Sequence, residues 1–242
     1  MARGLSTKGR FAVAYLLLGA AIGAGIGTFI VLLQREGPQP APPWSSWKPG
    51  STTLSTRMLE IARHVGKAYK LPSGDPLVAV RLGGSQGGAD FAGVAVVKKD
   101  NVRALEHQYG EDETAVFILC GQTKTCAIPE GEPSVARGAV LRREALELAL
   151  YTLEYVHAID NVLIFFPPGP GEKTLKSTLL FNRDDLSSSL SHPLRRTLPQ
   201  KQPPLSGQIA QREKETVDEL TVHTRYKYLG VAQNVIVIQP PA

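Results

Sequence analysis

Cysteine is scarce in this sequence, with only Cys120 and Cys126 among 242 residues. Because these two cysteines do not form a C-x-x-C pair, a redox motif is missing, and two thiols alone cannot complete a tetrahedral zinc site. Glu154 and His157 have the Glu-x-x-His spacing of di-iron helix bundles, but the sequence lacks the second copy that such a site requires. We therefore expect neither a metal ion nor another cofactor.

Beyond residue 33, the chain has nearly equal numbers of basic and acidic residues. The formal net charge is +5, but residues 1–33 contain three basic residues and no acidic residue. The remaining 24 basic residues face 22 acidic ones. A domain with so balanced a charge has no one-sided field with which to hold a phosphate backbone, so we expect no nucleic-acid partner.

Charged residues are absent between Phe11 and Leu33. As a helix, residues 11–33 are about 34 Å long at roughly 1.5 Å per residue, enough to cross a hydrocarbon core of about 30 Å. The basic residues before this run place residues 1–10 in the cytoplasm by the positive-inside rule. The sequence therefore predicts a single-pass protein of the cell membrane, in contact with the lipid bilayer, with an extracytoplasmic C-terminal part.

A cleaved signal peptide is the alternative interpretation of this segment. Ala20, Ala21 and Ala24 imitate the small residues of a cleavage site. The apolar run continues past them from Ile26 to Leu33, however, and so exceeds the ~7–15 apolar residues of a typical signal peptide. This length favours a retained signal-anchor.

Glycine recurs every four residues within the predicted membrane helix, at Gly19, Gly23 and Gly27. Residues at this spacing share one helix face, and a stripe of small residues lets another helix approach closely. One interpretation is self-association or pairing with another membrane protein. The other is that glycine is simply common in membrane helices, and the spacing alone leaves both open.

Residues 34–52 are rich in proline and predict a semi-extended linker, which one domain over residues 53–242 follows. Apolar periodicity predicts helices at Thr53–Lys70 and Ser134–Ala158, and hence an α+β or α/β domain with a mixed sheet packed against a long buried helix. The predicted strands are Leu77–Leu82, Phe91–Val97, Ala115–Cys120, Cys126–Ile128, Val162–Phe166, Thr178–Phe181, Thr221–Leu229 and Val235–Ile238. The long helix between two strands indicates that these two strands are parallel.

The polar residues of the long helix gather in one narrow stripe, which we expect to face solvent. The stripe consists of Arg143, Glu144, Glu147 and Glu154. Arg142 instead lies toward the apolar arc. A buried guanidinium requires a carboxylate or an anionic ligand, whereas near a helix start its long side chain can extend to solvent, which is the interpretation we favour.

The run Gly83-Gly84-Ser85-Gln86-Gly87 fits the pattern G-x-S-x-G and resembles the nucleophile elbow of the α/β hydrolases. The resemblance implies that Ser85 is a nucleophile, with Asp160 and then His192 or His223 following in the hydrolase order. The residues after the motif are strand-like, whereas the elbow requires a helix there. We therefore favour a loop that joins two strands, in which the glycines supply turn conformations.

Because no complete catalytic set is evident, the sequence favours a non-catalytic binding or structural role outside the cytoplasm. The alternatives are a membrane-tethered serine hydrolase and a small accessory subunit of a membrane complex. In an oxidising compartment Cys120 and Cys126 are expected to form a disulfide. Arg195, Arg196 and Lys201 form a basic cluster, which is either a solvated loop or a contact for acidic envelope polymers.

Overall fold

The computed structural model describes residues 12, 15–25, 29, 42–129, 133–169, 172, 174–200, 203 and 209–241, which fall into two units, Met1–Pro42 and Pro43–Ala242. In the first unit, residues 15–25 are helical. Gly19 and Gly23 lie in this helix, and a Cβ added at either would meet no atom within 4 Å. Gly27 lies outside the described residues. Among the described residues, no helix combines the length and the hydropathy needed to cross a bilayer.

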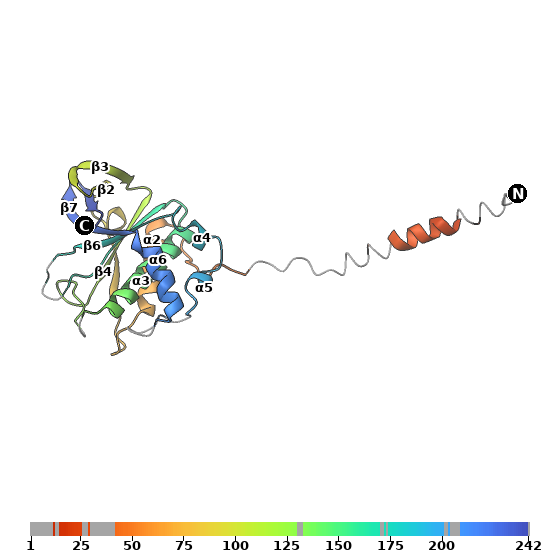
Figure 1. The fold of residues 1–242 in the computed structure, drawn as a ribbon, viewed down its shortest axis with the longest axis horizontal. Helices are drawn as coiled ribbons and strands as arrows, with labels where there is room; N and C mark the ends of the chain where they lie inside the picture. Colours follow the sequence, from red (N-terminus) through yellow and green to blue (C-terminus); the bar gives the residue numbers. More distant parts are fainter. Residues whose placement is uncertain are drawn as a thin grey trace. The chain divides into compact units, whose positions relative to one another are not determined.

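The second unit contains one eight-stranded mixed sheet (Figure 1) with the strand order β1-β4-β5-β6-β7-β8-β2-β3. The strands are β1 Ala79–Leu82, β2 Gly93–Lys98, β3 Asn101–Gly110, β4 Thr114–Cys120, β5 Asn161–Phe165, β6 Ser177–Asn182, β7 Arg225–Ala232 and β8 Val235–Gln239. Two pairs, β4–β5 and β2–β8, are parallel, and the other neighbours are antiparallel. The predicted mixed α+β domain, with parallel strands on either side of the long helix, is confirmed.

The helices lie against the β1-β4-β5-β6 half of this sheet (Figure 1). They are α2 Leu54–Ala68, α3 Val135–Tyr155, α4 Ser187–Leu190, α5 Leu194–Thr197 and α6 Gln211–Val222. The Ser134 side chain accepts a hydrogen bond from the backbone N–H of Arg137 and so caps the start of α3. Helix α6 is not predicted from the sequence, because the polar surface of this helix hides its apolar periodicity. The predicted strand Thr221–Leu229 overlaps the end of α6, whereas the observed strand β7 begins only at Arg225.

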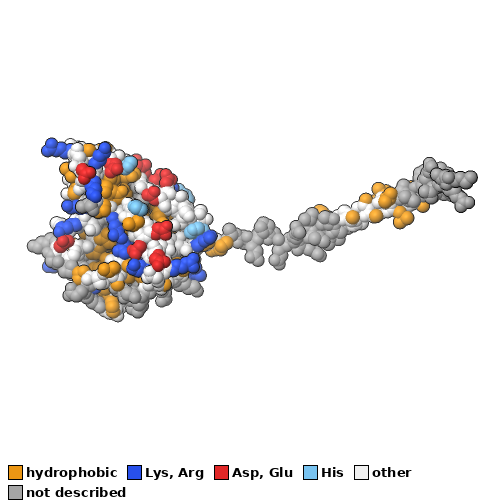
Figure 2. All heavy atoms as spheres, viewed as in Figure 1, with side chains coloured by type: hydrophobic (Ala, Val, Ile, Leu, Met, Phe, Trp, Pro, Cys, Tyr) orange, Lys and Arg blue, Asp and Glu red, His pale blue; other side chains and the backbone are white. Residues whose placement is uncertain are grey.

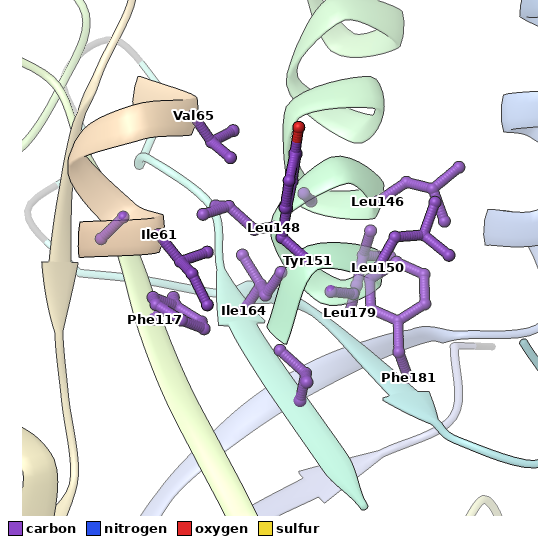
Figure 3. Packing of buried hydrophobic residues seen from close by; sticks show 14 of the residues in the cluster. Ile61, Val65, Phe117, Leu146, Leu148, Leu150, Tyr151, Ile164, Leu179 and Phe181 are labelled. Carbon is purple, nitrogen blue, oxygen red and sulfur yellow. The ribbon is translucent and has the colours of Figure 1, made fainter. Parts of the chain in front are cut away.

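Both sides of the central strands are buried, in two separate apolar cores. On the helix side, Val162 and Ile164 of β5 belong to a core shared with α2 and α3, and Figure 3 shows Ile61, Leu148 and Ile164 pointing into it. Leu163 on the other side of β5 joins Val94 of β2 in the second core. In a flat sheet these two strands, four positions apart, would be about 19 Å from each other at ~4.8 Å per strand. The sheet therefore curves, and its concave side encloses the second core.

The folded unit includes residues 43–52, which were expected to be linker. Trp47 stacks on His64 with ring centroids 3.9 Å apart, and the Trp44 ring contacts Tyr151 edge-on at 5.5 Å. The backbone N–H of Leu194 also donates to the carbonyl oxygen of Trp44. The tryptophans thus pack on the domain itself, against α2 and α3.

The expectation of a solvated polar stripe on α3 is wrong for Arg143 and Glu144, which are 1% and 0% exposed. Arg143 Nε lies 2.5 Å from Glu213 Oε1 of α6, and its Nη1 donates to the Tyr69 hydroxyl just after α2. Its Nη2 donates to the carbonyl oxygen of Gln200 at 3.1 Å. The stripe is buried because α2 and α6 flank α3 on either side, so solvent reaches little of the helix surface that faces away from the sheet.

Glu144 is the other buried member of this stripe, and neither of its carboxyl oxygens has a hydrogen-bond partner among the described residues. Burial raises the pKa of Glu144 well above its ordinary value, and repulsion from Glu147 raises it further. The raised pKa favours the neutral carboxyl group, and a neutral group avoids an uncompensated buried charge.

We expect Arg143→Met to lower the free energy of unfolding by about 3–5 kcal/mol, because it leaves the buried Glu213 carboxylate without its cation. The double variant Arg143→Met/Glu213→Leu should recover part of this loss, since apolar side chains of similar volume replace a buried ion pair at little cost, while Glu147, 3.1 Å from Arg143 Nη1, still lacks its cation. Urea unfolding followed by the fluorescence of Trp44 and Trp47, the only two tryptophans, measures both.

Arg142→Met provides the matched control for this prediction. Arg142 is the neighbouring arginine on the same helix, and its ion pair with Asp218 is partly exposed, with side-chain exposures of 18% and 35%. Its loss should cost about 1 kcal/mol or less. Equal losses for Arg142→Met and Arg143→Met would contradict the role assigned to the buried pair.

Candidate functional site

A cavity of about 530 Å³ lies where the first turns of α3 meet the end of β5 and the starts of β6 and β7. Four of its lining residues are basic, namely Arg142, Lys176, Arg225 and Lys227. Its apolar wall includes Phe166, Pro167 and Leu179. We call this cavity the basic pocket.

Strand register places the two basic residues of β7 in this pocket. Arg225 pairs with Leu179 and Lys227 with Ser177 across the antiparallel β6–β7 ladder. Cross-strand partners share one side of a sheet, and Leu179 faces the helical layer. Arg225 and Lys227 therefore project from the same side, next to Arg142 of α3.

The basic pocket has more positive than negative charge. Arg142 Nη2 lies 2.5 Å from Asp218 Oδ1, and Lys176 Nζ lies 2.6 Å from Glu172 Oε1, so these two cations are paired. Within the described part of the chain, Arg225 and Lys227 are exposed and form no ion pair. Two uncompensated cations therefore stand beside an apolar wall. Figure 2 shows both acidic and basic side chains on the visible face of the folded unit.

Of the residues of this site, the sequence singles out only Arg142, as a guanidinium that would require a carboxylate or an anionic ligand if buried. Arg225 and Lys227 alternate with Thr224, Tyr226 and Tyr228 in the sequence, and the structure places the two basic side chains on the side of β7 opposite Tyr226. Arg142 was expected to extend to solvent, whereas the structure pairs it with the carboxylate of Asp218. Asp218 belongs to α6, 76 residues away, so no local pattern reveals this contact.

Ser85 occupies a short 3-10 helix, Ser85–Gly87, and is exposed. Its hydroxyl lies 3.4 Å from the carbonyl oxygen of Phe91. Among the described residues that line the cavity at Ser85 there is no histidine. Asp160, the acid that the hydrolase resemblance implies, is instead paired with Arg183 at 2.7 Å. The structure therefore does not assemble Ser85 and Asp160 into a catalytic arrangement.

The glycines around Ser85 have conformational roles. Gly84 and Gly88 adopt φ angles of +59° and +78°, which side chains rarely allow. A Cβ at Gly87 would lie 2.4 Å from the carbonyl oxygen of Leu82. These constraints account for the motif as a tight connection between β1 and β2, which is the loop interpretation.

Cys120 and Cys126 form the predicted disulfide, with their Cα atoms 4.4 Å apart. Cys120 is buried at the end of β4, while Cys126 lies in a loop with a φ angle of +62° rather than in the predicted return strand Cys126–Ile128. The backbone N–H of Gly121 donates to the carbonyl oxygen of Cys126 at 2.7 Å. The disulfide and this bond together close the loop.

No family model, curated protein or solved structure compared with the chain matches it. Within the described ranges, no group of three or more His, Cys, Asp or Glu residues is placed to hold a metal ion. Any functional assignment therefore rests on the geometry of the folded unit, where the basic pocket combines size, uncompensated charge and an apolar wall.

We expect the two cysteine thiols to resist alkylation in protein isolated without reductant and to react after reduction. Breaking the bond by Cys126→Ser should lower the free energy of unfolding by about 2 kcal/mol, as expected for the release of so short a loop. Mass spectrometry after alkylation and urea unfolding measure the two effects. Two freely alkylated thiols in the unreduced protein would contradict the disulfide.

Proposed function

We propose that the chain is a single-pass membrane protein whose folded unit lies outside the cytoplasm and binds an anionic ligand without chemical conversion. The uncharged run from Phe11 to Leu33, with basic residues before it, supports the anchor and its orientation. The disulfide Cys120–Cys126 supports an oxidising compartment, since such bonds are rare in the cytosol.

The uncompensated cations Arg225 and Lys227 beside the apolar wall carry the ligand assignment. A carboxylate or phosphate group can accept charge-assisted hydrogen bonds from both side chains. An apolar part of the same ligand can pack against Phe166 and Pro167, which line the pocket. A pocket of about 530 Å³ is in the usual range for small ligands. The ligand is therefore an anion that carries an apolar group.

A binding role is favoured over catalysis by the polar groups that the pocket presents. Besides the four cations, the described lining offers the hydroxyl group of Ser177 but neither a histidine nor a carboxylate. A hydroxyl nucleophile requires an adjacent base. Pairing of the anchor through Gly19, Gly23 and Gly27 remains a separate prediction, compatible with a binding domain or with an accessory subunit.

We expect the full-length protein in zwitterionic lipid nanodiscs to bind phenyl phosphate, with an affinity reduced at least tenfold in Arg225→Gln/Lys227→Gln. The two substitutions remove the cations that hold the phosphate but leave the apolar wall in place. Isothermal titration calorimetry measures the affinity. Phenol, which lacks the anion, should bind at least tenfold more weakly than phenyl phosphate.

Arg195→Gln/Arg196→Gln is the matched control for the binding experiment, because it removes two exposed cations from α5, outside the basic pocket. It should bind phenyl phosphate like the wild-type protein. An equal loss in both double variants would show only a general charge effect, and the assignment of the basic pocket would be wrong.

We also expect a protease added to intact cells to cleave the folded unit, and the protein to remain in the membrane fraction after carbonate extraction. Both outcomes follow from an anchor over residues 11–33 with its basic end in the cytoplasm. Immunoblotting of the C-terminal part measures them. Protection from the protease in intact cells, or release by carbonate, would overturn the proposed location.

A further inference from the structure

A second cavity, of about 440 Å³, lies on the concave side of the curved sheet and differs in chemistry from the basic pocket. It is lined by Tyr109, Asn161, Asn182, Asp184 and Asp185, together with the ion pair Asp160–Arg183. We call it the polar pocket. Its lining is largely hydrogen-bonding groups.

The topology of the sheet explains why these groups converge. Asn161 is the first residue of β5 and pairs directly with Asn182, the last residue of β6. Asn161 lies two residues from Leu163, and Asn182 lies two residues from Leu180. Residues two apart in a strand share one side of the sheet, and both leucines belong to the second core, so the two asparagine side chains project from the concave side. Tyr109 of β3 packs against the same core. The polar pocket is thus the open end of the curved sheet, and such mouths commonly hold ligands.

Two asparagine side chains at the base of this pocket have polar atoms without a hydrogen-bond partner among the described residues. Asn161 is only 5% exposed, and its side chain makes no hydrogen bond within the described part of the chain. Asn182 Oδ1 is also buried without a partner among the described residues, although Asn182 Nδ2 donates to Asp185 Oδ2 at 3.3 Å. Asn182 Oδ1 is the fully buried acceptor of the two, and leaving such a group unsatisfied costs about 1–3 kcal/mol, so together with the neighbouring Asn161 amide it points to a ligand that would satisfy it.

The charge of the polar pocket is negative. Within the described ranges, Asp184 and Asp185 are exposed and form no ion pair. Arg183, the pocket's only described cation, donates to Asp160 and to the carbonyl oxygens of Leu153, Val156 and Ile159, so its hydrogen-bonding capacity is largely used.

Tyr109 adds a neutral hydroxyl group to this acidic surrounding. Burial raises the pKa of Tyr109; a side-chain hydrogen bond with Asn182 lowers it, while repulsion from Asp185, Glu113 and Glu106 raises it, and the net shift is upward, so the hydroxyl stays protonated. Acceptor oxygens therefore outnumber free donors in the polar pocket. A matching ligand must supply N–H or O–H donors and positive charge.

We propose that the polar pocket binds an organic cation through a primary ammonium group. An ammonium group presents three N–H donors and one positive charge. Asn182 Oδ1, the side-chain oxygen of Asn161 and the carboxylate of Asp185 supply the acceptors. A bare metal ion is disfavoured, because the carboxylates of the described residues do not converge on one point as metal ligation requires. The two pockets thus take ligands of opposite charge on opposite sides of the sheet.

Titration of the full-length protein in zwitterionic nanodiscs with 1,4-diaminobutane, at low ionic strength, tests the proposal by calorimetry. We expect binding that is weakened at least tenfold in Asp184→Asn/Asp185→Asn, whose two exposed substitutions leave the fold intact. Asn161→Ser should weaken it as well. The matched control Asp75→Asn/Asp100→Asn removes two exposed carboxylates outside the polar pocket and should bind like the wild-type protein.

Neutral 1,4-butanediol has nearly the same shape as the diamine and should bind at least tenfold more weakly. Equal binding of the diol, unchanged diamine binding in Asp184→Asn/Asp185→Asn, or no diamine binding at all would overturn the proposal. Binding of calcium chloride in place of the diamine would overturn it too. Arg225→Gln/Lys227→Gln should bind the diamine normally, so failure of this proposal is distinguishable from failure of the basic pocket.

Discussion

The buried contact between Arg143 of α3 and Glu213 of α6 determines how the helical layer closes over the sheet. Arg143 also reaches Tyr69 after α2 and the backbone of Gln200, so one guanidinium connects four segments of the chain. Leaving either charge unpaired inside the protein would cost several kcal/mol. This requirement holds α6 in place, and with it Asp218, whose carboxylate positions Arg142 at the basic pocket.

Curvature of the sheet is the second constraint, and it creates the two pockets. Helices cover the β1-β4-β5-β6 half on one side, while β2 and β8 fold over the concave side and enclose the second core. Where α3 begins, the helical layer leaves a gap beside β6 and β7, which is the basic pocket. At the ends of β5 and β6 the second core gives way to the polar pocket. Strand β6 contributes to both, because its successive residues point to opposite sides.

The sequence predicts those parts of the fold that depend on local periodicity. The two long helices near Thr53–Lys70 and Ser134–Ala158 and the buried strand Val162–Phe166 agree with α2, α3 and β5 within a few residues. The polar edge strand β3 and the polar helix α6 were missed, because each buries too few apolar residues to produce a clear pattern. The cysteine pair was predicted correctly, since short spacing makes the required Cα separation attainable.

By itself, the sequence determined the uncharged N-terminal run, the disulfide-forming cysteines, the α+β class and the alternation that sets Arg225 and Lys227 on one side of a strand. These are properties of neighbouring residues. Only the tertiary structure decided which polar side chains meet. It buried Arg143 and Glu144, paired Arg142 with Asp218 and Asp160 with Arg183, and joined Tyr109 to Asn161 and Asn182. Such contacts join residues far apart in the chain, and the packing of helices on a curved sheet is what brings them together.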